Sequence, residues 1–509
     1  MSSSHRPHEA ADDPIEDEDA MLDPAEAAEE IPQDPDHPME SDSGDGEEPD
    51  QEIQLQNDSI AHFDLHNDSI FCISQHPIHP NIIATGGGDD TAYIFDSTPP
   101  DPPLLPASYE SNPQPSAERG SLKALAKLEG HTDSVNATTF TLPRGEYVLS
   151  AGLDGRLRAY RDSSRSSDGT LWTFVAEVQE VQEISWVIPC PHPGYPNTLA
   201  LGGSDGSVWV YMVNAEEKGS ELGIVQAFYL HTESCTAGAW TPDGKMLATV
   251  SEDGSLCVWD VFGEASAAGI SGEGGGQSVM ALTAEDQRFA VEGGLYSVAV
   301  SPTGAFVVVG GAGGNIKVVG LPRIGAGPSS ATAGAKGGGA MGKAGGGKKA
   351  GGQVASSSGV GQAGQILASL QAQSDGIETL AFSPPPLTLL AAGSVDGSIA
   401  LFDTAHRFAV RRHIRGAHEE FAVVKVEFVD DARTRGWLLT SAGMDGVVRR
   451  WDTRGGTAAA GQGLVGEWKG HRGDGEGGGV LGFVQGGGGE GIVTAGDDGV
   501  ALVFASPVA

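Results

Sequence analysis

The sequence SAGMDGVVRRWD, residues 441–452, contains the pattern that decides the fold. An apolar strand ends in a turn in which Asp445 is followed by glycine, and a second strand leads from that turn to Trp451. The same pattern recurs at residues 150–160 and 251–260. A unit of this size cannot bury its own hydrophobic face. It must stack against neighbouring copies, so the number of copies determines the architecture.

Eight copies align on this turn, and the short apolar runs between them predict an all-β structure. The aligned turns lie at residues 85–90, 150–155, 203–206, 251–254, 310–314, 396–397, 441–446 and 497–499. The fifth copy is degenerate, because glycines replace the aspartate. The last copy stops after its third strand near Phe504, and a strand-like segment without a repeat of its own, residues 59–65, precedes the first copy. We expect this segment to supply the missing fourth strand and to close the ring.

A four-stranded unit with Gly-His before its first strand and Trp-Asp at the end of its third resembles the WD40 family of β-propellers. The resemblance implies an eight-bladed propeller over residues 58–504, with an acidic tail at 1–57 and a short C-terminal tail at 505–509. In WD40 blades His, Ser or Thr, Asp and an aromatic residue form a hydrogen-bonded relay. The positions that match it are His131, Ser150, Asp154 and Tyr160; His231, Asp253 and Trp259; and His418, Ser441, Asp445 and Trp451.

Ser, His and Asp are also the members of a catalytic triad, but here the set recurs in repeat after repeat, which one enzyme does not need. A buried histidine requires a partner for each ring nitrogen, and Asp and Ser supply both as structural groups. The chain has no HExxH motif and no His spaced with Cys as in zinc sites. The sequence therefore predicts a non-enzymatic protein without a metal or cofactor.

The chain is strongly acidic, with a formal net charge of −39 over 509 residues. The first 50 residues hold 19 acidic residues and one basic residue, which leaves −21 for the rest. The first 57 residues are too polar to offset the entropy of ordering, so we expect them to be disordered. An acidic surface disfavours direct contact with nucleic acid or anionic membranes and favours basic polypeptides.

Other features of the sequence bear on compartment and on surface loops. No apolar run indicates a signal peptide or a membrane span, and the four cysteines form no CxxC pair. A cytoplasmic or nuclear monomer with reduced thiols is the expectation. Insertions at residues 97–121, 263–278 and 324–364 each follow a third strand, and their Pro-rich or Gly-rich composition predicts flexible loops on one face.

Acidic residues recur in the loops that precede the first strands and in the turns before the third strands. In a WD40 propeller both open on the same face. Turn chemistry alone accounts for aspartate in the turns. It accounts less well for the scarcity of basic residues in these loops, so we predict a protein-binding acidic face. Its residues, called the acidic ring below, are Asp68, Asp133, Glu180, Glu183, Glu233, Glu252, Glu292, Asp375, Glu378, Glu419, Glu420 and Asp474.

A narrower resemblance rests on HNDSIFC at 66–72, ATGGGDDTA at 84–92, and the segments at 130–135 and 392–400, together with eight repeats and an acidic tail. These are similar to the family of the angio-associated migratory cell protein and the fungal suppressor-of-QSR-truncations ribosome-assembly chaperone. The resemblance implies a dedicated chaperone for one basic large-subunit ribosomal protein, of the universal L-sixteen type formerly called L-ten. It would hold that protein's N-terminal segment on the acidic face and support 60S assembly. The alternative is a generic WD40 scaffold, such as a ubiquitin-ligase adaptor or a signalling propeller.

Overall fold

The computed structural model divides the chain into two compact units, Met1–Gln54 and Leu55–Ala509. It describes only residues of the second unit. These are residues 56–99, 120–163, 172–270, 277–324, 363–431, 433–454, 463–471, 478–486 and 488–506. The predicted disorder of the acidic tail therefore concerns residues that lie, almost entirely, outside the described part of the chain.

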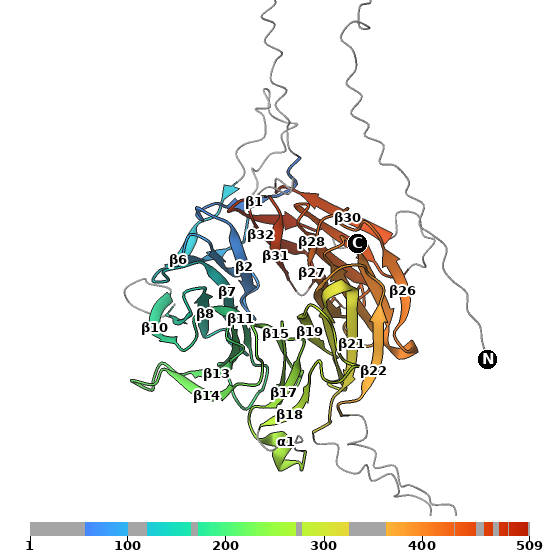
Figure 1. The fold of residues 1–509 in the computed structure, drawn as a ribbon. Coiled ribbons are helices and arrows are strands. Elements are labelled where there is room, and N and C mark those ends of the chain that lie inside the picture. The colour runs from blue at the N-terminus through green and yellow to red at the C-terminus, as the bar shows by residue number, and fades with distance from the viewer. Residues whose placement is uncertain are drawn as a thin grey trace, which may run out of the picture. The chain divides into compact units, whose positions relative to one another are not determined.

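The second unit is a ring of eight antiparallel β-sheets, or blades, around a central channel (Figure 1). Blades one to four consist of β2 (Ile70–Gln75), β3 (Ile82–Gly87), β4 (Ala92–Asp96) and β6 (Ala124–Leu128); β7 (Val135–Phe140), β8 (Tyr147–Gly152), β9 (Arg156–Asp162) and β10 (Trp172–Gln179); β11 (Ile184–Pro189), β12 (Thr198–Gly203), β13 (Val208–Val213) and β14 (Leu222–Phe228); and β15 (Cys235–Trp240), β16 (Met246–Ser251), β17 (Leu256–Asp260) and β18 (Ser278–Leu282).

Blades five to eight repeat this arrangement. They consist of β19 (Leu295–Val300), β20 (Phe306–Gly311), β21 (Asn315–Gly320) and β22 (Ile366–Gln371); β23 (Ile377–Phe382), β24 (Leu389–Ser394), β25 (Ile399–Asp403) and β26 (Ala409–Ile414); β27 (Val423–Phe428), β28 (Leu438–Gly443), β29 (Val447–Asp452) and β30 (Leu464–Lys469); and β31 (Val480–Gln485), β32 (Gly491–Gly496) and β33 (Ala501–Ala505). The degenerate fifth repeat thus forms a complete blade. The eight-bladed propeller predicted from the sequence is confirmed.

The N-terminal strand closes the ring as predicted. β1 (Ala61–Phe63) pairs antiparallel with β33 and supplies the fourth strand of blade eight. A short strand that the sequence did not indicate, β5 (Gly120–Ser121), then pairs parallel with β1 on its outer side. Phe63 is fully buried and stacks on Phe95 of blade one, with ring centroids 4.3 Å apart. The closing strand is therefore held by side-chain packing as well as by its backbone hydrogen bonds to β33.

The blades are held together by apolar side chains packed between neighbouring sheets. The second strand of each blade is almost wholly buried, as in β8, β12 and β28. The eight first strands contact one another in sequence around the channel, and β31 contacts β2 at the closure. This arrangement fixes both ends of every first strand at the rims of the channel, where the candidate site lies.

The insertions all follow third strands, which are β4, β17 and β21. Most of the insertions lie outside the described residues, namely 100–119, 271–276 and 325–362. Their predicted flexibility therefore stays a prediction. The second insertion, however, opens with a single helical turn, α1 (Glu264–Ala267), where we expected loop. The Asp260 carboxylate accepts the backbone N–H groups of Ala265 and Ser266 and so stabilises this turn.

Two 3₁₀ turns complete the secondary structure of the described residues, η2 (Ala312–Gly314) and η3 (Thr404–His406). No helix in these ranges is long and apolar enough to cross a membrane.

Candidate functional site

The relay of blade seven shows what fixes the loops of this face. His418 is fully buried, and its Nδ1 lies 2.8 Å from Asp445 Oδ1 while its Nε2 lies 2.7 Å from Ser441 Oγ. The indole N–H of Trp451 donates to the same Ser441 oxygen over 2.9 Å. Every polar atom of the set has a structural partner, so the four residues form the relay that the sequence predicted.

Other blades build the relay with variations. His131 bonds to Asp154 and Ser150, but the Tyr160 hydroxyl donates to the carbonyl of Glu129 instead of joining the relay as expected. In blades one and eight, threonine replaces serine. Those relays are His66 with Asp89 and Thr85, and His471 with Asp498 and Thr494.

Blade four departs further from the pattern. His231 Nδ1 lies 2.6 Å from Ser255 Oγ, and Asp253 is reached only through that serine and through the Thr232 N–H. The relay partner on the other side is Thr249, which also accepts the Trp259 N–H. We predicted a direct link between His231 and Asp253 and missed both hydroxyl residues. The Asp-Gly-Ser spacing at 253–255 was the available signal.

Burial sets the charge of these histidines. It lowers the pKa of His66, His131 and His418 below 6.5, although the paired aspartate offsets part of the effect. His231 has no direct carboxylate partner, and burial lowers its pKa to about 4. These four histidines are therefore neutral near pH 7 and hold their loops by hydrogen bonds rather than as ions.

In blades two to six, the turn before the third strand lies against the loop that leads into the next blade. Gly155, with a φ of 73°, lies so close to that loop that a Cβ would be 2.1 Å from the Val181 carbonyl oxygen. The same contact closes the circle between the first and last blades, where Gly499 faces the Asp68 carbonyl and Ser69 Oγ donates to Asp497 Oδ1 over 2.6 Å. The inter-blade loops thus meet in one ring on one face.

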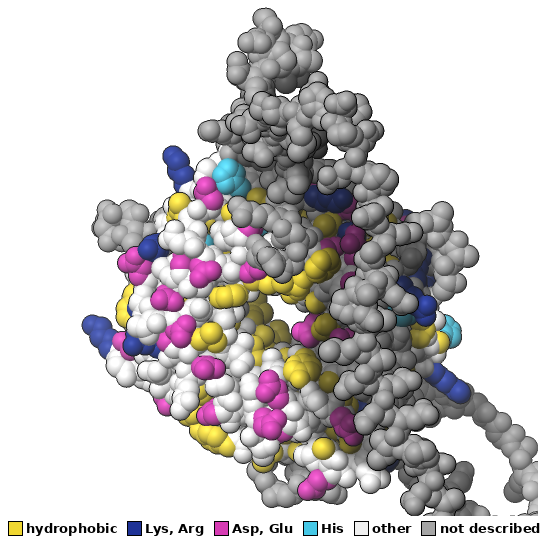
Figure 2. All heavy atoms as spheres, turned by 45° about the horizontal axis from the view of Figure 1, so that its top comes forward, with side chains coloured by type: hydrophobic (Ala, Val, Ile, Leu, Met, Phe, Trp, Pro, Cys, Tyr) yellow, Lys and Arg dark blue, Asp and Glu magenta, His cyan; other side chains and the backbone are white. Residues whose placement is uncertain are grey.

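The acidic ring occupies these loops and turns. Eleven of its twelve predicted members lie in the described residues, and all eleven side chains are exposed. Asp474 lies outside the described residues. Figure 2 shows one face of the propeller, on which Asp and Glu side chains surround the central opening while Lys and Arg lie mainly at the periphery.

Three ring aspartates share one local geometry. Asp68, Asp133 and Asp375 each accept the backbone N–H of the following residue with Oδ1, at 2.7, 2.8 and 2.7 Å. This bond holds the carboxylate, and within the described residues the second oxygen, Oδ2, accepts no hydrogen bond. A carboxylate held in this way is prepared to accept hydrogen bonds from a ligand.

The ring charges are not neutralised within the described residues. Two arginines at this end of the blades pair instead with acids outside the ring. Arg158 pairs with Glu177, and Arg449 pairs with Asp445 and Glu467. None of the ion pairs of the described residues includes a ring member. The face therefore carries a concentrated negative field.

Glu378 differs from the other ring members in its surroundings. It stands on β23, at the channel, rather than on a loop. Desolvation by the surrounding protein raises the pKa of its carboxyl, and repulsion from Asp375 adds to this. A bound cation would remove that repulsion.

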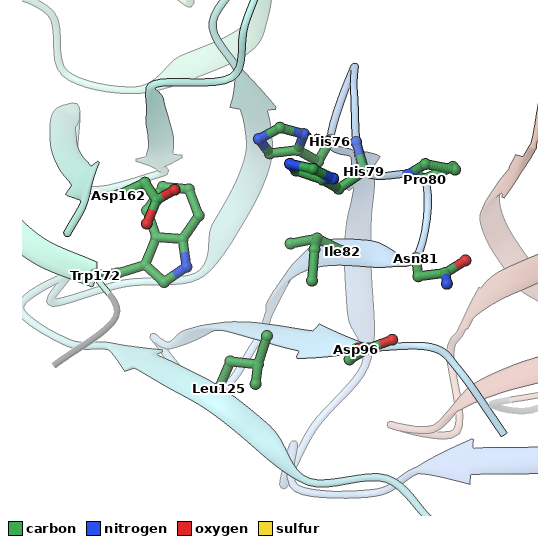
Figure 3. Close-up of a pocket in the computed structure, with 9 residues that line it drawn as sticks. All are labelled: His76, His79, Pro80, Asn81, Ile82, Asp96, Leu125, Asp162 and Trp172. Carbon is green, nitrogen blue, oxygen red and sulfur yellow. Dashed lines mark hydrogen bonds between the residues drawn. The ribbon is translucent and has the colours of Figure 1, made fainter. Parts of the chain in front are cut away.

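A cavity of about 410 Å³ lies at the opposite ends of the strands, between blades one and two (Figure 3). His76 and His79 stand above it, and Asp162 and Trp172 line one side. His76 Nδ1 accepts the backbone N–H groups of Ile78 and His79, so the His76 ring is a structural group. In the described parts of the chain, no cluster of three or more His, Cys, Asp or Glu is placed to hold a metal ion. The acidic ring remains the stronger candidate site.

Comparison with known proteins agrees with this geometry. The family described as WD domain, G-beta repeat matches residues 57–96, 122–161, 223–260, 287–319 and 364–403. The closed ring of blades built from such repeats makes this protein a WD40 propeller, and one of its faces carries the acidic ring.

The particular family follows from the solved structures. The chain is 53% identical to Sqt1 of Chaetomium thermophilum bound to the N-terminus of the ribosomal protein L10, with a TM-score of 0.73, covering 89% of this chain and 100% of that one. It is 31% identical to the ribosome assembly protein SQT1 of Saccharomyces cerevisiae over 216 residues, 42% of this chain and 43% of that protein. It is 25% identical to the human angio-associated migratory cell protein, over 88% of this chain and 80% of that protein. The chain belongs to the Sqt1 family.

Proposed function

We propose that this protein is a dedicated chaperone of a basic large-subunit ribosomal protein of the L10 type and supports 60S ribosome assembly. The acidic ring holds the N-terminal segment of this client. The observation that carries the proposal is the ring of eleven exposed carboxylates without an ion pair among the described residues.

The chemistry of the ring matches such a client. Ribosomal proteins are rich in Lys and Arg, and a free basic segment binds RNA non-specifically. Carboxylates accept charge-assisted hydrogen bonds from guanidinium and ammonium groups without any nucleic acid. Because ribosomal RNA presents a denser array of negative charge, it can compete for the same groups and release the client at the assembly site.

Two further aspects belong to this proposal. A binding role needs no catalytic group, and the Ser-His-Asp sets are already used by the blades as structural relays. A role in the late assembly of the large subunit is consistent with a location in the cytoplasm, with the nucleus as a second compartment.

Affinity purification from growing cells tests the proposal. We expect a tagged chain to recover one L10-type ribosomal protein in near-equal amount, as quantified by mass spectrometry. The triple variant Asp133→Lys, Glu233→Lys, Glu420→Lys should lose it.

The matched control reverses the same number of exposed acids on the opposite face, by Glu217→Lys, Asp430→Lys and Glu490→Lys. This variant has the same net charge and should retain the client. Recovery of a ubiquitin ligase or of signalling proteins instead, with both variants alike, would support the scaffold alternative.

A further inference from the structure

Every blade has a β-bulge at the same place. The ladder between the first and second strands shifts register at the second residue of the first strand in all eight described blades. A bulge leaves that residue outside the ladder and turns its side chain in a new direction. The eight residues, called the bulge ring, are Phe71, Asn136, Ser185, Thr236, Tyr296, Glu378, Val424 and Leu481.

The bulge ring lies beside the acidic ring. In blades one, two, four and six the bulged residue follows a ring acid by three positions, as Phe71 follows Asp68. Both sets stand at the same end of the first strands, and these strands border the channel. A segment bound to the acidic ring would therefore pass over the bulge ring.

Two polar members of the bulge ring, Asn136 and Thr236, form hydrogen bonds to the next blade. Asn136 donates to the Ile184 carbonyl of blade three over 2.6 Å, and Thr236 donates to the Leu295 carbonyl of blade five over 2.7 Å. These bonds join one blade to the next. The side chains of Asn136 and Thr236 therefore stabilise the ring.

Three apolar members stand on consecutive blades, and their side chains cannot join blades by hydrogen bonds. We call these three residues the apolar arc. Val424, Leu481 and Phe71 belong to blades seven, eight and one, whose first strands contact one another. Phe71 is 41% exposed, and the other two are half-buried. Met444 in the turn of blade seven packs against Gly479 and extends the arc. Figure 2 shows hydrophobic side chains along the upper edge of the central opening.

We infer that Val424, Leu481 and Phe71 form a specificity site that takes an apolar or aromatic side chain of the client segment. The inference rests on the proposed function and adds a second recognition element to it. Carboxylates alone bind any basic polypeptide, because charge attraction is insensitive to the rest of the sequence. An apolar arc inside a ring of acids selects a basic segment that also presents an apolar side chain at the right position.

A double-mutant cycle tests the inference by titration calorimetry on the full chain. The probes are a synthetic L10 N-terminal peptide and a second peptide that keeps every Lys and Arg but has Ser at each apolar or aromatic position. The protein variants are Phe71→Ser with Leu481→Ser, and a control with Ile224→Ser and Val410→Ser. The control residues are 53% exposed on the outer strands β14 and β26.

The wild type and the control should bind the serine peptide about tenfold more weakly than the L10 peptide, the usual scale for burying one medium-sized apolar side chain. The arc variant should bind both peptides equally, so that the two changes are not additive. Equal binding of both peptides by the wild type, or additive losses, would overturn the inference while leaving the acidic ring as the binding site. No binding of either peptide by the wild type would overturn the proposed function itself. The peptide comparison on the wild type needs no variant to fold.

Discussion

At the scale of single residues, the relays hold the acidic loops in place. Blades four and six form this hydrogen-bonded link with side chains that differ from those of the other relays. In blade six Gln373 occupies the position of the histidine and donates to Ser398, which in turn donates to Asp396. In blade four His231 contacts Ser255 in the same manner. The position therefore requires a hydrogen-bonding side chain, and histidine is one choice among others.

This similarity leads to a prediction for pH dependence. Burial depresses the pKa of folded His231 to about 4, whereas 6.5 is its ordinary value. The unfolded chain therefore binds more protons between these values, so the stability that His231 contributes is complete above about pH 6.5 and is lost as the pH falls toward 4. The loss from this residue between pH 7 and pH 5 is about 2 kcal/mol. Denaturant titration should show a shallower pH dependence for His231→Gln, and an unchanged profile would contradict this account.

The complete relay of blade seven gives a second prediction at this scale. His418→Ala removes two buried hydrogen bonds and leaves Asp445 and Ser441 each without a histidine partner. We expect a loss of about 2–4 kcal/mol in unfolding free energy. His406→Ala is the control, since the His406 side chain is 79% exposed, and it should change stability by less than about 0.5 kcal/mol. Equal effects of the two substitutions would mean that the relay does not stabilise the blade.

At the scale of elements, the sequence predicted the number of blades and the closing strand but not the β-bulges or the helical turn α1. The eight turns gave the number of blades, and the unpaired segment at 59–65 gave the closing strand. The bulges were not predicted, because a bulge changes the register of a ladder without changing the alternation of apolar residues enough to be seen in one repeat. The helical turn α1 was missed because its Gly- and Ala-rich surroundings are typical of a loop.

The closing strand should be essential for stability. Phe63→Ala removes a fully buried ring that packs on Phe95 and Tyr93, and we expect a loss of about 3–5 kcal/mol. Leu65→Ala is the matched control, because Leu65 follows the same strand and is 43% exposed. Thermal unfolding followed by circular dichroism compares the two. If the two variants unfold at the same temperature, the closing strand does not stabilise the ring.

At the scale of the whole molecule, the closed ring of blades carries a fixed set of carboxylates on one rim. The acids in the inter-blade loops were predictable from the repeat alignment. Their lack of ion pairs within the described residues was not, because the positions of Arg158 and Arg449 relative to other acids depend on the folded blades. The apolar arc was likewise hidden until the register of the first strands was known.

The most direct test of the account is the affinity of the wild-type chain for the L10 N-terminal peptide as a function of salt. Because ring carboxylates supply the attraction, we expect the affinity to fall at least roughly tenfold between about 50 and 300 mM salt. The variant with Asp133→Lys, Glu233→Lys and Glu420→Lys should show no binding at low salt. An affinity that is insensitive to salt and survives the three reversals would contradict the claim that the acidic ring holds the client.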